Sequence, residues 1–417
     1  MKFNIWNDFP QKPLPELLDF IVDNRGKTVP TVSQEEACEI VLIATNCIRN
    51  ENLYPVYEKV RYISKETYEK WFRAHPISGD IIFVNKGTPG RICFCPENID
   101  FCIAQDMMAF RVNSSVLYNK YLLAVLRSRE MQEQIRITSV GDTIPHFKKE
   151  FLKELTIPLP PMDVQQIIGD YYFKLSEKIE LNKKINENLE QQALALFRHF
   201  FMDFTPYGGV APSNWTEVSL DDVCTRITDG SHYSPADAPD SPYPMYSVKD
   251  METYGFNPSS CKHISEEDFR KMQKGDCVPL LNDILVAKDG SYLKEIFICS
   301  EEKDEAILSS IAIFRPDINI IMPEILLYLL KQPSVRKDVG DNYVSGSALP
   351  RIVLKDFKKY RFMLPPMDEQ LKIGAILHAI RMQTKANIDE IYCLLSTRDA
   401  LLPRLMSGEI DVSAVKI

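Results

Sequence analysis

Two long stretches of the chain place apolar residues at alternating spacings of four and three. The first runs from about Asp163 to Phe201, and the second runs from about Asp368 to Leu405. Heptad spacing sustained over this length is typical of a helix that packs along another helix, rather than of a helix with one short buried stripe. The predicted seam residues are Ile168, Leu175, Asn182, Leu189 and Leu196 in the first helix, and Ile373, Ile380, Asn387, Leu394 and Leu401 in the second.

Two of these seam positions are polar. Asn182 and Asn387 occupy corresponding places in the two helices. A buried asparagine in a helical seam commonly fixes the register between the helices. An asparagine that is simply exposed has no such role, and the sequence leaves both interpretations open.

The same five letters, LPPMD, precede both helices, at residues 159–163 and again 205 residues later at 364–368. A double proline ends a strand and does not fit inside a helix. An aspartate directly after it suits the first turn of a helix, where the macrodipole favours negative charge. Each copy therefore predicts a joint between a strand and a helix.

Other segments recur at nearly the same offset. ISKETYEK at 63–70 corresponds to ISEEDFRK at 264–271, and GDIIFV at 79–84 corresponds to NDILVA at 282–287. The offset drifts from 201 to 205, as small loop insertions produce. A tandem duplication of nearly the whole chain follows. Each copy contains a mixed region of short alternating runs and short helical pieces, followed by one long helix. The predicted domains are a first recognition-type module at 1–160, a first helix at 161–206, a second module at 207–363, and a second helix with a tail at 364–417.

The expected fold class is α+β. We expect the two long helices, each about 55 Å long at 1.5 Å per residue, to pair as an antiparallel coiled-coil spacer with pseudo-two-fold symmetry. A rigid spacer between two similar modules suits a target that offers two sites at a fixed separation, and double-stranded DNA is the obvious target of this kind.

Composition places the chain among ordinary globular proteins, with 45% apolar and 26% charged residues. No run of apolar residues approaches the length of a membrane span, and the start lacks the core of a signal peptide, so we expect a cytoplasmic protein without membrane contact. The ten cysteines are scattered, which predicts reduced thiols. The net charge of −9 argues weakly against a nucleic-acid partner, so any phosphate-binding surface has to be a local patch.

No complete catalytic motif is present. The segment Gly26-Lys27-Thr28 resembles the end of a phosphate-binding loop, but the glycine that this loop requires earlier is Ile21. A nuclease-like set can be assembled from Asp240, Glu301 and Lys303, as chance matches often allow. The pattern Cys93-x-Cys95 with Cys102 lies in strand-like sequence, and we predict no metal site there. The chain is therefore predicted to be a recognition protein or adaptor without catalytic residues.

Three kinds of loop recur in both halves, around residues 24–28 and 229–233, 85–88 and 288–291, and 141–146 and 345–351. Each combines glycine with amide, hydroxyl or cationic side chains, which can reach phosphates or base edges. An ordinary solvated turn remains the alternative for any single residue. The candidate DNA-binding residues are Arg25, Lys27, Asn85, Lys86, Thr88, Arg91, Thr143, His146, Lys148, Ser231, His232, Tyr233, Lys249, Lys288, Ser291, Lys294, Ser347 and Arg351.

The whole chain resembles the specificity subunit of Type I restriction–modification systems. The features that carry the resemblance are the LPPMD-x-Q joints, KIELNKKINENLEQQALALF in the first helix, the C-terminal LLPRLMSGEIDV, the two IS-initiated segments, the Gly-Asp-Ile strand and DGSHY at 229–233. The resemblance implies that each module is a target-recognition domain for one half of a bipartite DNA sequence. It also implies that the helices set the gap and dock two methyltransferase subunits, which motor-nuclease subunits then join.

The resemblance further implies that the chain has no activity and binds no cofactor. Adenine methylation, ATP-driven translocation and cleavage belong to the partner subunits, which bind S-adenosylmethionine, ATP and magnesium. Because the two modules differ strongly in sequence, we predict an asymmetric target. The acidic net charge predicts weak DNA binding by this chain alone. The alternatives are a single-chain enzyme, a protein–protein scaffold, and a silent family member that has lost its partners.

Overall fold

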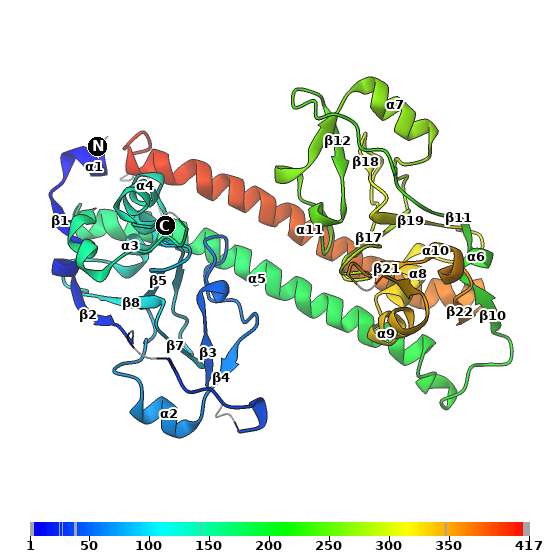
Figure 1. Ribbon diagram of the computed structural model, residues 1–417, viewed down its shortest axis with the longest axis horizontal. Helices are drawn as coiled ribbons and strands as arrows, with labels where there is room; N and C mark the ends of the chain where they lie inside the picture. Colours follow the sequence, from blue (N-terminus) through cyan, green and yellow to red (C-terminus); the bar gives the residue numbers. More distant parts are fainter. Residues whose placement is uncertain are drawn as a thin grey trace. The chain divides into compact units, whose positions relative to one another are not determined.

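The computed structural model describes residues 4–24, 26, 28–36, 40–141, 143–346 and 348–411. Unit 1 comprises Met1–Lys184 and Ile388–Ile417, and unit 2 comprises Ile185–Asn387. The two long helices, α5 (Met162–Phe201) and α11 (Met367–Met406), each pass from one unit into the other (Figure 1). Each compact unit is therefore one module together with a segment of both helices.

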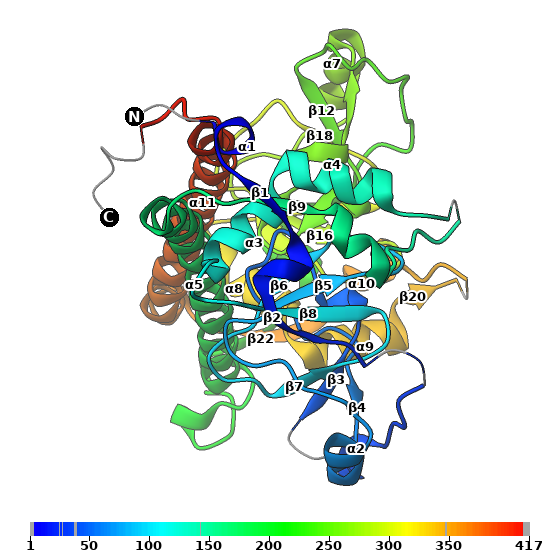
Figure 2. The same cartoon turned by 90° about the vertical axis from the view of Figure 1, so that its left-hand side faces the viewer.

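Unit 1 is built on short strands with the bounds Gln11–Pro13 (β1), Leu18–Val22 (β2), Val41–Ile43 (β3), Arg61–Tyr62 (β4), Ile81–Val84 (β5), Ile92–Phe94 (β6), Phe101–Ile103 (β7), Met107–Val112 (β8) and Thr156–Pro158 (β9). The main sheet is antiparallel in the order β2-β8-β5-β6, and Figure 2 shows β2 and β8 side by side. A smaller sheet has the order β4-β3-β7, with β3 and β7 parallel. The strand β1 pairs with β9, which ends one residue before the double proline, so the joint between strand and helix lies where the sequence predicts it. The helices of this module are Ile5–Asp8 (α1), Lys65–Lys70 (α2), Asn119–Arg127 (α3) and Arg129–Thr138 (α4), with 3₁₀ turns at Leu14–Leu17, Gln34–Glu36, Thr45–Cys47 and Lys149–Glu154.

Unit 2 repeats this plan. Its strands are Thr216–Ser219 (β10), Cys224–Asp229 (β11), Tyr243–Tyr246 (β12), Met251–Glu252 (β13), Gly255–Phe256 (β14), Lys262–Ile264 (β15), Ile284–Ala287 (β16), Ile296–Ile298 (β17), Ala306–Ile307 (β18), Ile311–Pro316 (β19), Val344–Ser345 (β20), Arg351–Ile352 (β21) and Arg361–Leu364 (β22). The sheet orders β11-β19-β16-β17 and β15-β12-β18 correspond strand for strand to those of unit 1, and β10 pairs with β22 as β1 pairs with β9. The helices are Leu220–Val223 (α6), Glu266–Lys274 (α7), Pro323–Leu330 (α8), Pro333–Asn342 (α9) and Leu354–Phe357 (α10), with 3₁₀ turns at Thr205–Tyr207, Val248–Asp250 and Pro258–Ser260.

The recurring Asp-Ile and Phe-Arg segments form a buried ion pair in each main sheet. Asp80 is 1% exposed and binds Arg111 through both carboxylate oxygens, at 3.1 and 2.9 Å. Asp283 is fully buried and binds Arg315 in the same way, at 2.8 Å for both contacts. A bidentate pair of this kind fixes the strand that directly follows the aspartate against its neighbour, because breaking the pair would leave a buried charge unpaired.

The core of unit 1 lies between one face of the main sheet and the helices. The run Tyr121–Leu126 in α3 is fully buried, and its cluster includes Phe83 and Phe110 from the sheet. The same cluster contains Ile168 from α5 and Leu405 from α11. Residues of both long helices therefore belong to the hydrophobic core of this module. In unit 2, α8 has the place in the core that α3 has in unit 1.

Within unit 1 the segments of α5 and α11 are antiparallel. Asn182 of α5 donates a 2.7 Å hydrogen bond to Glu390 of α11, which lowers the pKa of that carboxyl group. Tyr172 lies ten residues before Asn182 on α5, and Arg398 lies eight residues after Glu390 on α11. The guanidinium of Arg398 lies over the ring of Tyr172. Earlier residues of α5 therefore contact later residues of α11, which is the antiparallel arrangement.

Unit 2 has the same antiparallel pairing. Asn387 Nδ2 donates to Asn186 Oδ1 at 2.7 Å, and further along α5, Phe197 shares a core cluster with Leu377 of α11. Every predicted seam residue is buried or half-buried, and Asn182 and Asn387 are only 1% and 6% exposed. The buried interpretation of the two asparagines is confirmed.

The glutamine of each LPPMD-x-Q joint closes the same set of hydrogen bonds. Gln165 accepts from the backbone of Tyr118 at 2.9 Å and donates to the carbonyls of Val116 and Pro160 at 3.2 and 3.0 Å. Gln370 makes the equivalent contacts with Met322, Ile320 and Pro365, at 3.0, 2.9 and 3.0 Å. The motif thus ties the first turn of each long helix to the segment that leads into α3 or α8.

The α+β class, the tandem duplication and the antiparallel pairing of the long helices are confirmed. The long helices begin and end within the predicted ranges of 161–206 and 364–417. In the described part of the chain, none of the helices combines the length and the apolar character that crossing a bilayer requires.

Candidate nucleic-acid interface

Three loops of the first module meet at one place. Lys86 and His146 pair as an isolated antiparallel bridge, and Gly87 N–H donates to the carbonyl of Pro145 at 2.9 Å. The loop after β2 joins them, since it contributes to the same pocket. This pocket has a volume of about 580 Å³ and is lined by Asp23, Gly26, Arg73, Lys86, Gln105, Asp106 and His146. The three recurring loops of the sequence therefore form one surface, here called the first loop cluster.

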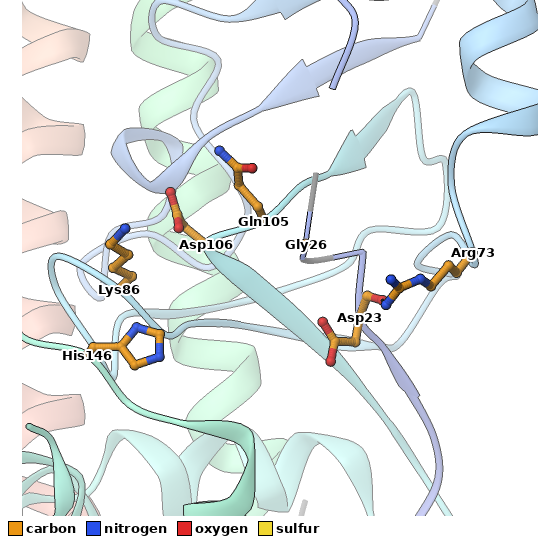
Figure 3. A pocket seen from close by; sticks show the side chains of 7 residues that line it. All are labelled: Asp23, Gly26, Arg73, Lys86, Gln105, Asp106 and His146. Carbon is orange, nitrogen blue, oxygen red and sulfur yellow. The ribbon is translucent and has the colours of Figure 1, made fainter. Parts of the chain in front are cut away.

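The pocket of the first loop cluster carries groups of both charges. In Figure 3, Lys86 and His146 lie on one side, while Asp23 and Arg73 lie on the opposite side. Gln105 and Asp106 lie between them, at the turn before β8. Such a mixture of cations, an amide and carboxylates matches the donors and acceptors that phosphates and base edges present.

A second hollow continues the cationic side of this cluster. It has a volume of about 600 Å³ and is lined by His146, Lys148, Lys149 and Glu150. Lys149 is bound to Asp23 at 3.2 Å, and Lys148 lies 3.5 Å from Glu150. Both lysines are exposed, so their side chains remain within reach of a polyanion.

Most predicted residues of the first cluster lie at the surface, but Asn85 does not. Its side chain is fully buried, because its backbone is held by hydrogen bonds to Asp106 at 3.0 Å and to Phe147 at 2.7 Å. Asn85 is therefore misplaced as a surface contact and instead joins two loops. The other predicted residues are exposed or, for His146, half-buried: Lys86, Thr88, Arg91, Thr143, His146 and Lys148.

The second module brings its three loops together in the same way. Asp289 and Arg351 form an isolated antiparallel bridge, and Gly290 N–H donates to Pro350 at 2.8 Å. Lys288 Nζ lies 2.5 Å from Asp229, which ties the loop at 229–233 to the other two. We call this set the second loop cluster.

Two predicted residues of the second cluster are buried. Lys288 is only 5% exposed, because Asp229 and, at 4.0 Å, Asp289 surround its ammonium group. Ser231 is 9% exposed and uses its hydroxyl to bind the backbone of Tyr233. The prediction that both side chains are exposed for DNA contact is therefore wrong. The remaining ones are exposed: His232, Tyr233, Lys249, Ser291, Lys294 and Arg351. The predicted residues Arg25, Lys27 and Ser347 lie outside the described residues.

The two clusters differ in charge at corresponding positions. The run His146-Phe147-Lys148-Lys149 corresponds to Arg351-Ile352-Val353-Leu354, so two lysines become apolar residues. Lys86 corresponds to Asp289. The first cluster is consequently richer in exposed cations than the second.

Sequence reasoning missed four residues that line the first pocket, namely Asp23, Arg73, Gln105 and Asp106. Arg73 follows α2 and is held there because Asn24 accepts a 2.9 Å hydrogen bond from its backbone. The turn at Gln105 and Asp106 joins two strands of different sheets.

The cysteines considered as metal ligands belong to the core. Cys93, Cys95 and Cys102 are fully buried. Burial raises the pKa of the Cys93 and Cys95 thiols, as is usual for core cysteines. Over residues that the structure describes, no group of three or more histidine, cysteine, aspartate or glutamate side chains is arranged to hold a metal ion.

Comparison with known proteins matches this duplicated architecture. The model of the Type I restriction modification DNA specificity domain matches the chain twice, at residues 12–191 and 212–391. The chain is 26% identical over 309 residues to the Type I restriction enzyme MjaIX specificity subunit of Methanocaldococcus jannaschii, covering 70% of this chain and 69% of that protein. It is 24% identical over 398 residues to the HindI specificity subunit of Haemophilus influenzae, covering 80% and 86%.

The fold is also similar to a solved structure. The crystal structure of a Type I restriction–modification S subunit from M. genitalium aligns with a TM-score of 0.54 and 17% identity, covering 96% of each chain. At this identity the likeness concerns the fold alone.

Proposed function

The chain belongs to the family of Type I restriction–modification DNA specificity domains, and from this premise we propose that it selects the DNA sequence on which a Type I complex acts. The observation that carries the proposal is the double match of the DNA specificity domain to residues 12–191 and 212–391. Each match contains one loop cluster. In this proposal each module reads one half of a bipartite, asymmetric target.

The difference between the clusters supports an asymmetric reading. Exposed Lys86, Lys148 and Lys149 give the first module several cations for phosphates, which position a protein on DNA without reading its sequence. In the second cluster Lys288 is paired with Asp229, and Arg351 with Asp289. In the first cluster Lys149 and Lys148 also have carboxylate partners, but both lysines are exposed, whereas Lys288 is buried. We therefore expect the first module to contribute more of the salt-dependent affinity.

Catalysis in this proposal belongs to partner subunits. Two methyltransferase subunits dock on α5 and α11, and motor-nuclease subunits join them; these partners bind S-adenosylmethionine, ATP and magnesium. Exposed apolar side chains on the long helices are available for such docking. They are Leu181 and Ile185 on α5, and Leu371, Ile376, Met382 and Tyr392 on α11.

The test is to co-express the chain with the methyltransferase subunit of its own system and to map every modified adenine on a plasmid of known sequence. We expect a split, asymmetric motif with a fixed unread gap, which disappears when either chain is omitted. A stable complex of the two proteins that modifies no adenine would instead support a scaffold or a silent member of the family.

A further inference from the structure

Arg351 has a special place in the second loop cluster, because its backbone is held from both sides. It pairs with Ser345 across the β20–β21 ladder and with Asp289 through the isolated bridge. The next residue, Ile352, donates to the carbonyl of Lys288 at 3.1 Å. The Cα position of Arg351 is thus fixed by the fold, as precise recognition requires.

The side chain of Arg351 is accessible and has a single acidic partner among the described residues. It is 55% exposed, and its Nε lies 3.2 Å from Oδ1 of Asp289, which is 13% exposed. A guanidinium group carries five N–H donors in a planar fork. Because Nε is the guanidinium nitrogen that lies within ion-pair distance of Asp289, the two terminal nitrogens are left for a ligand.

The charges around Arg351 favour a neutral acceptor over a phosphate. Lys288 is neutralised by Asp229 at 2.5 Å, and Arg351 is paired with Asp289, so the cluster holds equal numbers of cations and carboxylates in these two pairs. Carboxylates close to an arginine repel an incoming phosphate. The O6 and N7 atoms of guanine are neutral acceptors, and an arginine fork contacts both at once in the major groove.

The first cluster provides the contrast. At the position of Arg351 it has His146, and at the position of Asp289 it has the exposed Lys86. Lys148 and Lys149 follow directly, where the second module has Val353 and Leu354. The first cluster therefore has more exposed cations for phosphates, and the second has an arginine fork that suits a base edge.

We propose that Arg351 is a specificity-determining residue that reads a guanine in the half-site of the second module, and that Asp289 is the positioning residue that directs its fork. The inference rests on the proposed function and adds the identity of one base to it. It follows that the second half-site contains at least one guanine on one of its strands.

The test uses the complex of the full chain with its methyltransferase subunit, on a plasmid of known sequence. The variants are Arg351→Gln, which removes the charged fork, and Arg351→Lys, which keeps the charge and loses the fork. Arg361→Gln is the matched control, because Arg361 is 57% exposed and is also paired with a carboxylate, at 3.1 Å from Glu217, but lies on β22 outside the cluster. Methylated sites are mapped, and the affinity for an oligonucleotide duplex is measured over a range of salt concentrations.

We expect Arg351→Gln to lose the requirement for guanine at one position of the second half-site, Arg351→Lys to weaken it because lysine keeps a donor for guanine but loses the fork, and both variants to keep the first half-site. Discrimination against other bases at that position should fall roughly tenfold to hundredfold. Asp289→Asn should weaken discrimination at the same position, and Arg361→Gln should leave the motif unchanged. If Arg351→Gln fails to assemble, the Arg351→Lys complex decides the question.

Three results would overturn the inference. One is a second half-site without guanine on either strand. Another is an unchanged motif with uniformly weaker binding and a salt slope reduced by about one, which is the behaviour of a phosphate contact. The third is an unchanged motif and unchanged affinity. All three differ from failure of the proposed function, in which the wild-type complex itself produces no split motif.

Discussion

Gln165 and Gln370 show how a single buried residue fixes a large element. Gln165 is 2% exposed and makes three hydrogen bonds, two that join the start of α5 to the segment before α3 and one to the carbonyl of Pro160 in the preceding joint. Changing Gln165 to leucine keeps the approximate size but leaves one backbone N–H and two carbonyls without these partners. We expect a loss of about 2–4 kcal/mol in the free energy of unfolding, measured by urea denaturation.

The neighbouring Gln166 offers a matched control, because it lies one position further along the same helix and is exposed. Gln166→Leu should change the free energy of unfolding by less than about 0.5 kcal/mol. Equal denaturation midpoints for Gln165→Leu and Gln166→Leu would show that the glutamine does not hold the joint.

Residues that act through local sequence could be predicted, and residues that act through distant partners could not. The Asp80 and Asp283 strands, the double-proline joints and the seam positions of the two asparagines follow from periodicity and repetition, whereas the burial of those asparagines does not. Lys288 looked like a loop-tip cation, since its partner Asp229 is 59 residues away and only the folded sheet brings the two together. Asn85 was placed at the surface for the same reason.

At the scale of elements, the seam between α5 and α11 has a polar layer that can be tested. Asn387 donates to Asn186 at 2.7 Å, and both are at least nine-tenths buried. Asn387→Leu removes the donor and leaves the amide oxygen of Asn186 without this partner, so we expect a loss of about 1–3 kcal/mol in the free energy of unfolding. The double change to leucine at both positions should recover this loss, because an apolar pair replaces the polar one.

The specificity of the layer should appear in a second measurement. A buried polar pair restricts the register and the number of helices that associate, so the double variant should form mixed assemblies, seen as heterogeneous mass by light scattering. Asn188→Leu is the control on the same helix, since Asn188 is exposed. A single Asn387→Leu change as harmless as Asn188→Leu would remove the register role.

The arrangement of elements explains why the sequence predicts that the loops recur in both modules, but does not predict which of their side chains are exposed. Three loop types recurred in both halves, and both modules bring their three loops together through equivalent bridges, Lys86 with His146 and Asp289 with Arg351. The sheet topology of the repeat determines this meeting of loops. Which side chain at each tip remains exposed depends on pairing across the cluster, which periodicity does not encode.

At the scale of the whole molecule, the chain crosses between its two units once in each long helix, at residues 184–185 and at residues 387–388. A polar contact lies on each side of both crossing points, with Asn182 bound to Glu390 in unit 1 and Asn186 bound to Asn387 in unit 2. One heptad inserted after Lys184 and another after Asn387 therefore leaves the contacts within each unit intact. A whole heptad also preserves the apolar seam.

Each insertion lengthens its helix by about 10 Å, which corresponds to roughly three base pairs at 3.4 Å per pair. If helix length sets the gap, as we propose, the mapped motif of the double-insertion complex should keep both half-sites and separate them by about three more unread base pairs. A heptad in α5 alone is the control, because it leaves α11 without a matching length and should abolish modification. An active double-insertion complex with the original gap would assign the spacing to the partner subunits, whereas altered half-sites would indicate that the insertion had disturbed the modules.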